Sequence, residues 1–192
     1  MPRVVRKQKP PRLADYRSYK PYLRLDFDQR CAYCHIPELR YGPPGNYSVD
    51  HFRPKSRSEF QRLVCYYPNL FYTCMDCNRS KGNTWPHPHL CRQGFRFLNP
   101  CRDNMSKHWD VDRNGLLIAK TFAAEYTIAR LRLNRVELCE WRRDKVDLIA
   151  TVQDAARAIS LATGDALLVG PLRRVLERLR RKLDEEYANY WT

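Results

Sequence analysis

The chain has 192 residues, 43% of them hydrophobic, which suffices for one packed domain with an appendage or for two small domains. No apolar run is long enough to cross a bilayer, and no apolar stretch typical of a secretory signal follows the charged start, so we expect a cytoplasmic protein without a membrane partner. The formal net charge is +14, a surplus that favours nucleic acid as a partner over an acidic membrane surface, with solubility as the alternative explanation.

Residues 1–25 are predicted to form a basic arm. Pro2, Pro10, Pro11 and Pro21 leave little room there for regular helix. From residue 26 to residue 100 the chain is dense in Cys, aromatic, Gly and Pro residues. This composition is typical of a compact, loop-rich unit that needs a covalent or metal staple.

Residues 101–192 are predicted to hold a β-hairpin followed by a helical region. Asn114-Gly115 stands between two short apolar runs, and both residues accept the positive φ of a hairpin turn. From about Ala123 onward the apolar residues recur at helical spacing.

The last helix is amphipathic in the sequence pattern. Gly164 and Gly170 interrupt the helical spacing, and Pro171 suits the first turn of a new helix. Its apolar stripe predicts packing against another helix, within the chain or in an oligomer; the stripe consists of Leu172, Val175, Leu176, Leu179, Leu183 and Tyr187. The basic residues around the stripe suit either a solvated face or a phosphate backbone; they are Arg173, Arg174, Arg178, Arg180, Arg181 and Lys182.

The eight cysteines favour a metal site or plain thiols over disulfides, because no secretory signal is recognised. Two CxxC pairs match the ligand spacing of a closed, tetrahedral structural Zn²⁺ site; they are Cys31 with Cys34 and Cys74 with Cys77. A site closed by four sulfurs keeps no open position, so this Zn²⁺ is not the catalytic ion. The other cysteines lack paired spacing and are expected to be buried thiols; they are Cys65, Cys91, Cys101 and Cys139.

The spacer between the two pairs carries polar residues in a distinctive order. Asp50-His51 comes first, Asn69-Leu70 follows, and the second CxxC pair runs directly into Asn78 and then Lys81-Gly82. In this order residues 26–86 resemble the HNH, or ββα-metal, nuclease superfamily, whose zinc-bound members carry two CxxC pairs in the same relative places.

The resemblance implies an α+β fold with a zinc-stapled ββα-metal core. The first strand of its hairpin ends at His51, Asn69 lies in the connecting loop, and residues 74–81 open the helix. Zinc then pins the hairpin to the helix and holds the site in register.

The residue types suit phosphodiester hydrolysis. His51, neutral near pH 7, fits a general base that takes a proton from water. Asp50 and Asn78 offer oxygen ligands to one hard cation, and Asn69, by the resemblance, braces the loop and orients His51. The family often has His at the third position. Asn78 therefore shifts the expected catalytic metal from zinc or nickel towards Mg²⁺ or Mn²⁺.

Each residue taken alone also has a structural explanation. Asp50 is able to form a salt bridge with Arg53 or Lys55, and His51 is able to serve as a hydrogen-bonded core residue. The basic residues of these segments suit phosphate contacts or a solvated surface; they are Arg53, Lys55, Arg57, Arg79 and Lys81.

The sequence thus predicts a metal-dependent endonuclease acting on nucleic acid, DNA before RNA. Residues 127–135 and 138–143 also resemble HNH components of Septu-type and retron-associated antiphage systems, which implies an ATPase partner protein. One alternative is a non-catalytic zinc module that binds nucleic acid or a protein. Another is a helical adaptor, which predicts neither metal-dependent cleavage nor salt-sensitive DNA binding.

Overall fold

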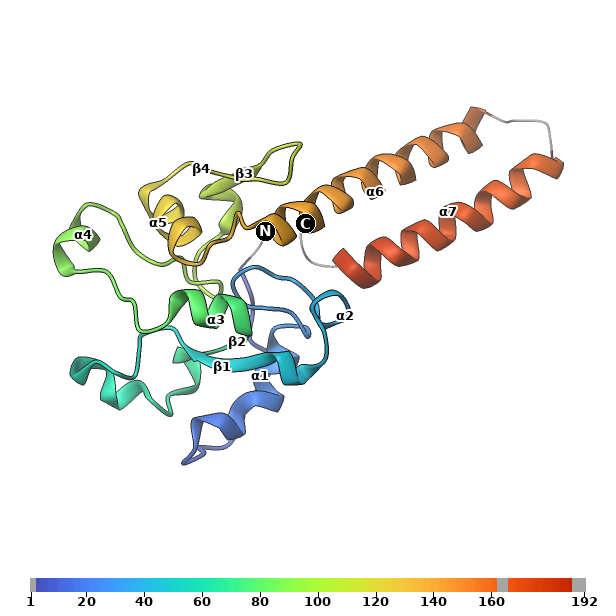
Figure 1. Ribbon diagram of the computed structural model, residues 1–192. Coiled ribbons are helices and arrows are strands. Elements are labelled where there is room, and N and C mark those ends of the chain that lie inside the picture. The colour runs from blue at the N-terminus through green and yellow to red at the C-terminus, as the bar shows by residue number, and fades with distance from the viewer. Residues whose placement is uncertain (1–2, 162–165, 188–192) are drawn as a thin grey trace.

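The computed structural model describes residues 3–161 and 166–187. These residues form helices and two small antiparallel sheets, so the predicted α+β class is confirmed at that level. One sheet belongs to a compact lower part of the molecule in Figure 1, and the two longest helices extend from the opposite side as an arm. Within the described ranges, no helix combines the length and apolarity needed to span a bilayer.

The first sheet pairs β1 (Tyr47–His51) with β2 (Leu70–Cys74), and α3 (Met75–Lys81) follows β2 without a loop. The register sets Asp50 opposite Phe71 and His51 opposite Leu70. All five residues of β2 are buried, since both α1 (Lys20–Asp26) and α3 contact it. A strand that ends at His51 and a helix that begins after Cys74 are where the sequence predicts them.

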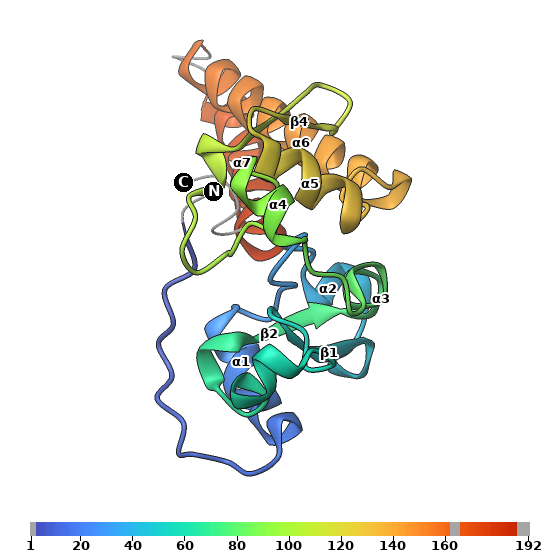
Figure 2. The same cartoon turned by 90° about the vertical axis from the view of Figure 1, so that its left-hand side faces the viewer.

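The N-terminal arm is fastened to this sheet rather than free. The Asp26 carboxylate accepts hydrogen bonds from the backbone N–H groups of Lys7 and Gln8 at 2.8 and 2.7 Å. Arg6 donates to the carbonyl of Leu70 in β2 at 2.6 Å. Figure 2 shows the arm running along one side of the molecule before it turns into the first helices.

Regular helix occurs in the segment where the prolines predict little of it. The 3-10 helix η1 (Tyr16–Tyr19) leads directly into α1. Pro21 stands in the first turn of α1, where a backbone N–H has no partner within the helix, so its missing donor costs nothing.

Short elements fill the connections between these parts. The short α-helices are α2 (Glu38–Tyr41) and α4 (Pro88–Arg92). The remaining 3-10 helices are η2 (Pro44–Asn46), η3 (Ser58–Leu63), η4 (Tyr67–Asn69) and η5 (Met105–Lys107). The loop from β1 to β2 contains η3 and η4.

The predicted hairpin at Asn114-Gly115 is confirmed. It joins β3 (Trp109–Val111) to β4 (Leu117–Ala119), and the Asp112 carboxylate accepts from the N–H groups of Asn114 and Leu116 across the turn. Gly115 has φ +81, and a Cβ there would collide with the carbonyl oxygen of Cys139. Only glycine suits such a position.

Three helices complete the chain: α5 (Phe122–Arg130), α6 (Val136–Leu161) and α7 (Ala166–Tyr187). The last two pack against each other as an antiparallel pair. Gly164 lies outside the described residues. The prediction that a helix starts at Pro171 is wrong, because Pro171 lies inside α7. Its ring removes one backbone hydrogen bond near the start of the helix, and apolar packing along α6 offsets that loss.

Candidate functional site

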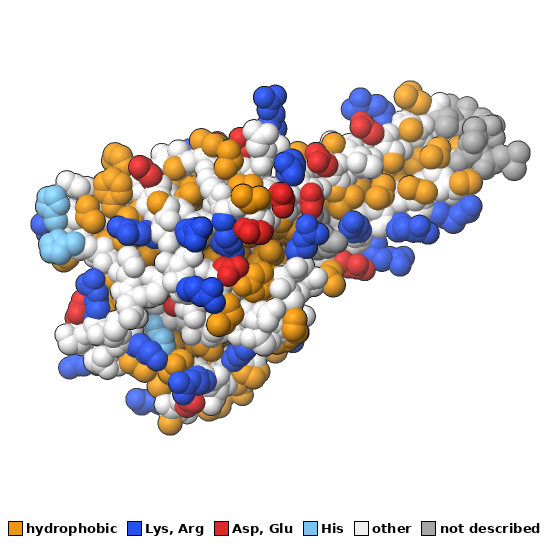
Figure 3. All heavy atoms as spheres, viewed as in Figure 1, with side chains coloured by type: hydrophobic (Ala, Val, Ile, Leu, Met, Phe, Trp, Pro, Cys, Tyr) orange, Lys and Arg blue, Asp and Glu red, His pale blue; other side chains and the backbone are white. Residues whose placement is uncertain are grey.

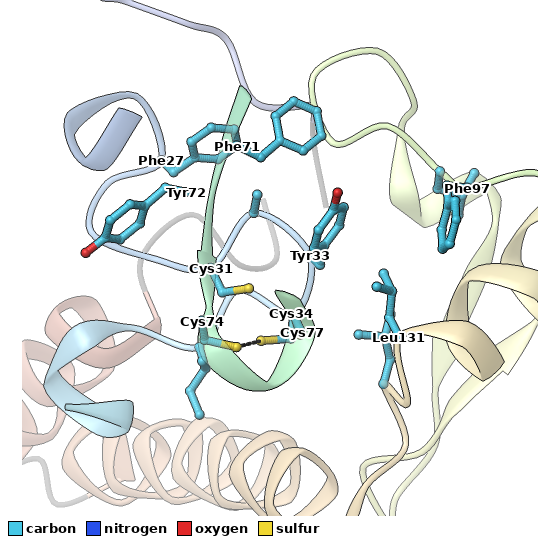
Figure 4. Packing of buried hydrophobic residues seen from close by; sticks show 14 of the residues in the cluster. Phe27, Cys31, Tyr33, Cys34, Phe71, Tyr72, Cys74, Cys77, Phe97 and Leu131 are labelled. Carbon is cyan, nitrogen blue, oxygen red and sulfur yellow. Dashed lines mark hydrogen bonds between the residues drawn. The ribbon is translucent and has the colours of Figure 1, made fainter. Parts of the chain in front are cut away.

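The four cysteines of the CxxC pairs converge in the structure. Their sulfur atoms all lie within 4.8 Å of one another, and all four residues are buried. The Sγ atoms of Cys34 and Cys74 are 3.8 Å apart (Figure 4). A tetrahedral ion with bonds of about 2.3 Å separates its sulfur ligands by about 3.8 Å, so the cluster fits a metal ion such as zinc.

Local backbone geometry brings the sulfurs together. Cys74 ends β2 and Cys77 lies in the first turn of α3, so one strand-to-helix junction presents two sulfurs. On the other side, His35 has φ +61 directly after Cys34 and donates its N–H to the carbonyl of Cys31. This tight turn presents the first pair. The cluster therefore ties the segment before α2 to the junction of β2 and α3.

The positive charge of Arg135 lies next to the sulfur atoms of the cysteine cluster. The Arg135 guanidinium lies 3.7 Å from Cys77 Sγ and 3.9 Å from Cys74 Sγ. Burial lowers the pKa of Arg135, but the thiolates of Cys34, Cys77 and Cys74 outweigh that and raise it above its ordinary value. Arg135 precedes α6, so this contact also fastens the base of the helical arm to the cluster.

The other cysteines do not match the expectation of buried thiols. Cys91 is exposed, whereas Cys65, Cys101 and Cys139 are partly exposed. Cys91 lies in the short helix α4, none of whose residues is buried, so its side chain stays at the surface. Within the described ranges, only Cys31, Cys34, Cys74 and Cys77 form a candidate metal cluster.

A pocket of ≈ 330 Å³ lies at the end of β1, between the β1–β2 loop and α3. Asp50, His51 and Asn78 line it together. The structure thus brings together three of the four residues predicted to act in catalysis. They come from β1 and α3, which are held in register because β1 pairs with β2 and α3 follows β2 without a loop.

Asp50 is held by two donors. The Tyr33 hydroxyl donates to its Oδ2 at 2.6 Å, and the Lys81 ammonium lies 3.1 Å from the same oxygen and 3.2 Å from Oδ1. Lys81 also donates to the carbonyl oxygen of His51 at 2.6 Å. The salt bridge of Asp50 is therefore with Lys81, and not with Arg53 or Lys55. A carboxylate has about four lone-pair positions, so these three contacts leave one position without a donor from Tyr33 or Lys81.

His51 is fixed in one tautomer. Its Nε2 lies 2.9 Å from the carbonyl oxygen of Val64, and because a carbonyl only accepts, Nε2 carries the proton and Nδ1 is left with a lone pair. The Tyr16 ring packs edge-on against the imidazole at 4.6 Å between centroids. Burial lowers the pKa of His51 below its ordinary value, which keeps the ring neutral at pH 7.

Asn69 and Asn78 play different structural parts. Asn69 is buried outside the pocket lining and closes the β1–β2 loop, because its Oδ1 accepts from Arg53 N at 2.9 Å and its Nδ2 donates to the carbonyls of Arg53 and Leu63. Asn78 lines the pocket and donates from Nδ2 to Ser48 Oγ at 2.7 Å, which orients its amide.

The five basic residues predicted as phosphate contacts divide into two groups. Lys55 and Arg79 are exposed and line the pocket, Arg53 is exposed near the rings of Phe60 and Trp85, and Arg57 is partly exposed. Lys81 is fully buried. Because its ammonium is occupied by Asp50 and His51, the prediction of Lys81 as a phosphate contact is wrong.

Three contacts around the site were not predicted from the sequence. Tyr33 lies between the two cysteines of the first pair, and nothing in that spacing indicates a bond to Asp50. Tyr16 comes from η1, far away in sequence, and its hydroxyl accepts from Lys55 at 2.9 Å. For Lys81 a signal existed. It follows Cys77 by four residues, and residues at i and i+4 share a helix face.

We expect Lys81→Met to destabilise the protein by about 3 kcal/mol or more, because it leaves the buried carboxylate of Asp50 without its cation. Chemical denaturation monitored by circular dichroism measures this change. Lys55→Met is the matched control, since Lys55 is exposed, and its loss should cost less than about 1 kcal/mol. Equal stability of the two variants would show that the buried pair is not structural.

Comparison with known proteins adds distant relatives. No protein-family model matches the chain. The chain is 27% identical over 145 residues to Septu protein PtuA of Bacillus mycoides (strain KBAB4), across 63% of this chain and 20% of PtuA. It is 28% identical over 149 residues to PtuB of the same strain, across 65% of this chain and 50% of that protein.

PtuB of Bacillus thuringiensis is 26% identical over 165 residues, across 83% of this chain and 59% of that protein. The chain is a distant homologue of Septu proteins. These alignments span between 20% and 59% of the length of the relatives.

Proposed function

We propose that the chain is a metal-dependent endonuclease of the HNH type that hydrolyses phosphodiester bonds, in DNA rather than RNA. The observation that carries this proposal is the shared pocket. Asp50, His51 and Asn78 line one cavity beside the cysteine cluster. An acceptor nitrogen, a carboxylate and an amide in one pocket are the groups that metal-assisted hydrolysis of a phosphodiester needs.

His51 acts as the general base in this proposal. Its Nε2–H is held by Val64, so Nδ1 takes the proton from the attacking water. Asp50 and Asn78 hold one Mg²⁺ or Mn²⁺ ion, which neutralises charge on the scissile phosphate when bound. Asn69 keeps the loop beside His51 closed, and the exposed Lys55 and Arg79 contact neighbouring phosphates.

The Septu relatives support a role in antiphage defence, and we propose that role for this chain. The names PtuA and PtuB denote two different Septu proteins, which supports action beside a protein partner. We propose an ATPase as that partner and the cytoplasm as the location. The four-cysteine cluster holds a structural Zn²⁺ in this proposal and takes no part in the chemistry.

One observation favours a second function, a non-catalytic zinc module that binds nucleic acid or a protein. Asp50 already has a cation partner in Lys81, and a carboxylate in a buried ion pair is often purely structural. The combination of Asp50, His51 and Asn78 in one pocket argues against this alternative, because a binding module has no use for that set of groups.

Cleavage of supercoiled plasmid tests the proposed function. We expect nicking only when Mg²⁺ or Mn²⁺ is added, and we expect Asn78→Ala to need roughly tenfold more metal, since even outer-shell contacts change metal affinity by about that factor. Ser48→Ala is the control: it removes the partner of the Asn78 amide but keeps the oxygen ligand, so its metal requirement should change less.

Folded, zinc-loaded protein that cleaves neither DNA nor RNA with the proteins encoded beside it would contradict the proposal. Cleavage by Asn78→Ala at the metal concentration that suits the wild type would remove Asn78 from the ligand set.

A further inference from the structure

The helix α7 carries a dense run of positive charge on the arm. Six of its ten residues 173–182 are Arg or Lys and one, Glu177, is acidic. We call these six the basic stripe: Arg173, Arg174, Arg178, Arg180, Arg181 and Lys182. All six are exposed. Figure 3 shows Lys and Arg side chains gathered along the edge of the arm over α7, beside a line of hydrophobic side chains.

The apolar side of α7 is already used. Leu176 is buried, and Leu172, Leu179 and Leu183 are partly buried at helical spacing from it. These residues recur every three to four positions and therefore share one side of the helix. That side faces α6, with which α7 makes its packing contacts. The basic stripe lies on the remaining surface, with Arg174, Arg178 and Arg181 opposite the apolar side. The other three, Arg173, Arg180 and Lys182, lie along the edges of that side.

The stripe forms no ion pair with any residue in the described part of the chain. Elsewhere several arginines are paired, as Arg24 is with Glu38 and Arg96 is with Asp103. Arg174 and Arg178 are four residues apart, and like charges at that spacing destabilise a helix. A cluster of like charge without internal partners is the pattern expected of a surface that meets an external polyanion.

The chemistry of the stripe fits phosphate better than an acidic protein. Guanidinium groups bind phosphate oxygens through two parallel N–H donors. Protein interfaces centre on large apolar or aromatic anchors, whereas Val175 is the exposed large apolar residue among the described side chains of α7. Ten helical residues extend about 15 Å, and a duplex carries one charge per about 1.7 Å of its axis. Several phosphates therefore fit along the stripe.

We propose that the basic stripe of α7 binds the phosphate backbone of a double-stranded nucleic acid and holds it against the helical arm formed by α6 and α7. This binding surface is separate from the pocket of Asp50 and His51 and makes no demand on the metal ion. The inference rests on the proposed function, since a nuclease has to hold its substrate, but binding is measurable without cleavage.

The test compares two triple variants of the full chain, each lacking three positive charges. Arg174→Gln/Arg178→Gln/Arg181→Gln changes the stripe. Arg102→Gln/Lys107→Gln/Arg113→Gln changes exposed residues around η5 and the β3–β4 hairpin, outside α7. Each is made in a His51→Ala background so that the probe stays intact. Fluorescence anisotropy measures binding of labelled DNA and RNA duplexes across a series of NaCl concentrations, and circular dichroism checks the helix content.

We expect the stripe variant to bind at least about tenfold more weakly and to lose about 2–3 units of the slope of log K against log salt, one for each phosphate contact removed. The control variant should keep both values. Equal weakening of both variants would show general electrostatics and overturn the proposal. Unchanged binding by the stripe variant would also overturn it and point to an acidic protein partner. Preference for one duplex identifies the polyanion.

The two proposals fail separately in this design. Stripe-dependent binding with no cleavage by the wild type would remove only the nuclease. Cleavage by the wild type together with stripe-independent binding would remove only this inference.

Discussion

Replacing Cys77 by Ser is expected to release the bound metal and to unfold the part of the chain around the first sheet. The four sulfurs join the segment before α2 to the junction of β2 and α3. Binding of structural zinc contributes roughly 10–16 kcal/mol of apparent free energy in small zinc domains. A change of 1 kcal/mol shifts the melting temperature by about 2–4 °C in a chain of this size. We therefore expect a fall of about 10 °C or more, or no cooperative transition at all.

Metal content by elemental analysis and thermal unfolding by circular dichroism measure this effect. Cys91→Ser is the matched control, because Cys91 is an exposed cysteine outside the cluster, and it should leave both values unchanged. Wild-type protein that contains no metal, or a Cys77→Ser variant as stable as the wild type, would show that the cluster is not a metal staple.

The parts of the fold that the sequence predicted correctly depend on short-range rules. A CxxC pair presents two sulfurs whatever surrounds it, and two such pairs need only one ion to meet. Asn114-Gly115 forms the predicted turn, in which only Gly115 of the two has a positive φ. The strand that ends at His51 and the helix after Cys74 are different, because the family resemblance implied them and the structure contains both.

The parts that were missed depend on contacts between distant segments. No periodicity places the Tyr33 hydroxyl on the Asp50 carboxylate, because the pairing arises only after the first CxxC turn packs on the sheet. Tyr16 reaches His51 from η1 in the same way. The N-terminal arm is held by Asp26, whose carboxylate accepts from the backbone N–H groups of Lys7 and Gln8. Nothing in the sequence pairs Asp26 with these two residues.

The error at Pro171 shows how tertiary packing overrides a local signal. Gly170-Pro171 is a strong helix boundary in isolation. In the structure the helix begins at Ala166 and continues through both residues. The apolar side of the helix packs on α6. One lost hydrogen bond costs less than the packing of a whole helix contributes. The error at Lys81 is different in kind, because Lys81 lies one helical turn after Cys77 and therefore shares its buried helix face.

His51→Ala is expected to lower the rate of metal-dependent cleavage by about 10²–10⁴-fold, the contribution typical of a general base. The lone pair on Nδ1 is the feature responsible, because the bond from Nε2 to the carbonyl of Val64 leaves that nitrogen as the acceptor. Plasmid nicking at saturating Mg²⁺ measures the loss. His89→Ala is the control, since His89 is an exposed histidine in α4 and lies outside the pocket lining.

Metal content and helix content of His51→Ala separate a loss of chemistry from a loss of folding. None of the four cluster cysteines lines the pocket, so His51→Ala should keep its metal content and helix content. A variant that is folded, zinc-loaded and inactive assigns the base to His51. A variant that keeps its rate within about tenfold would instead leave the imidazole a packing role between Val64 and Tyr16, and the proton would have to go to solvent or to another group in the pocket.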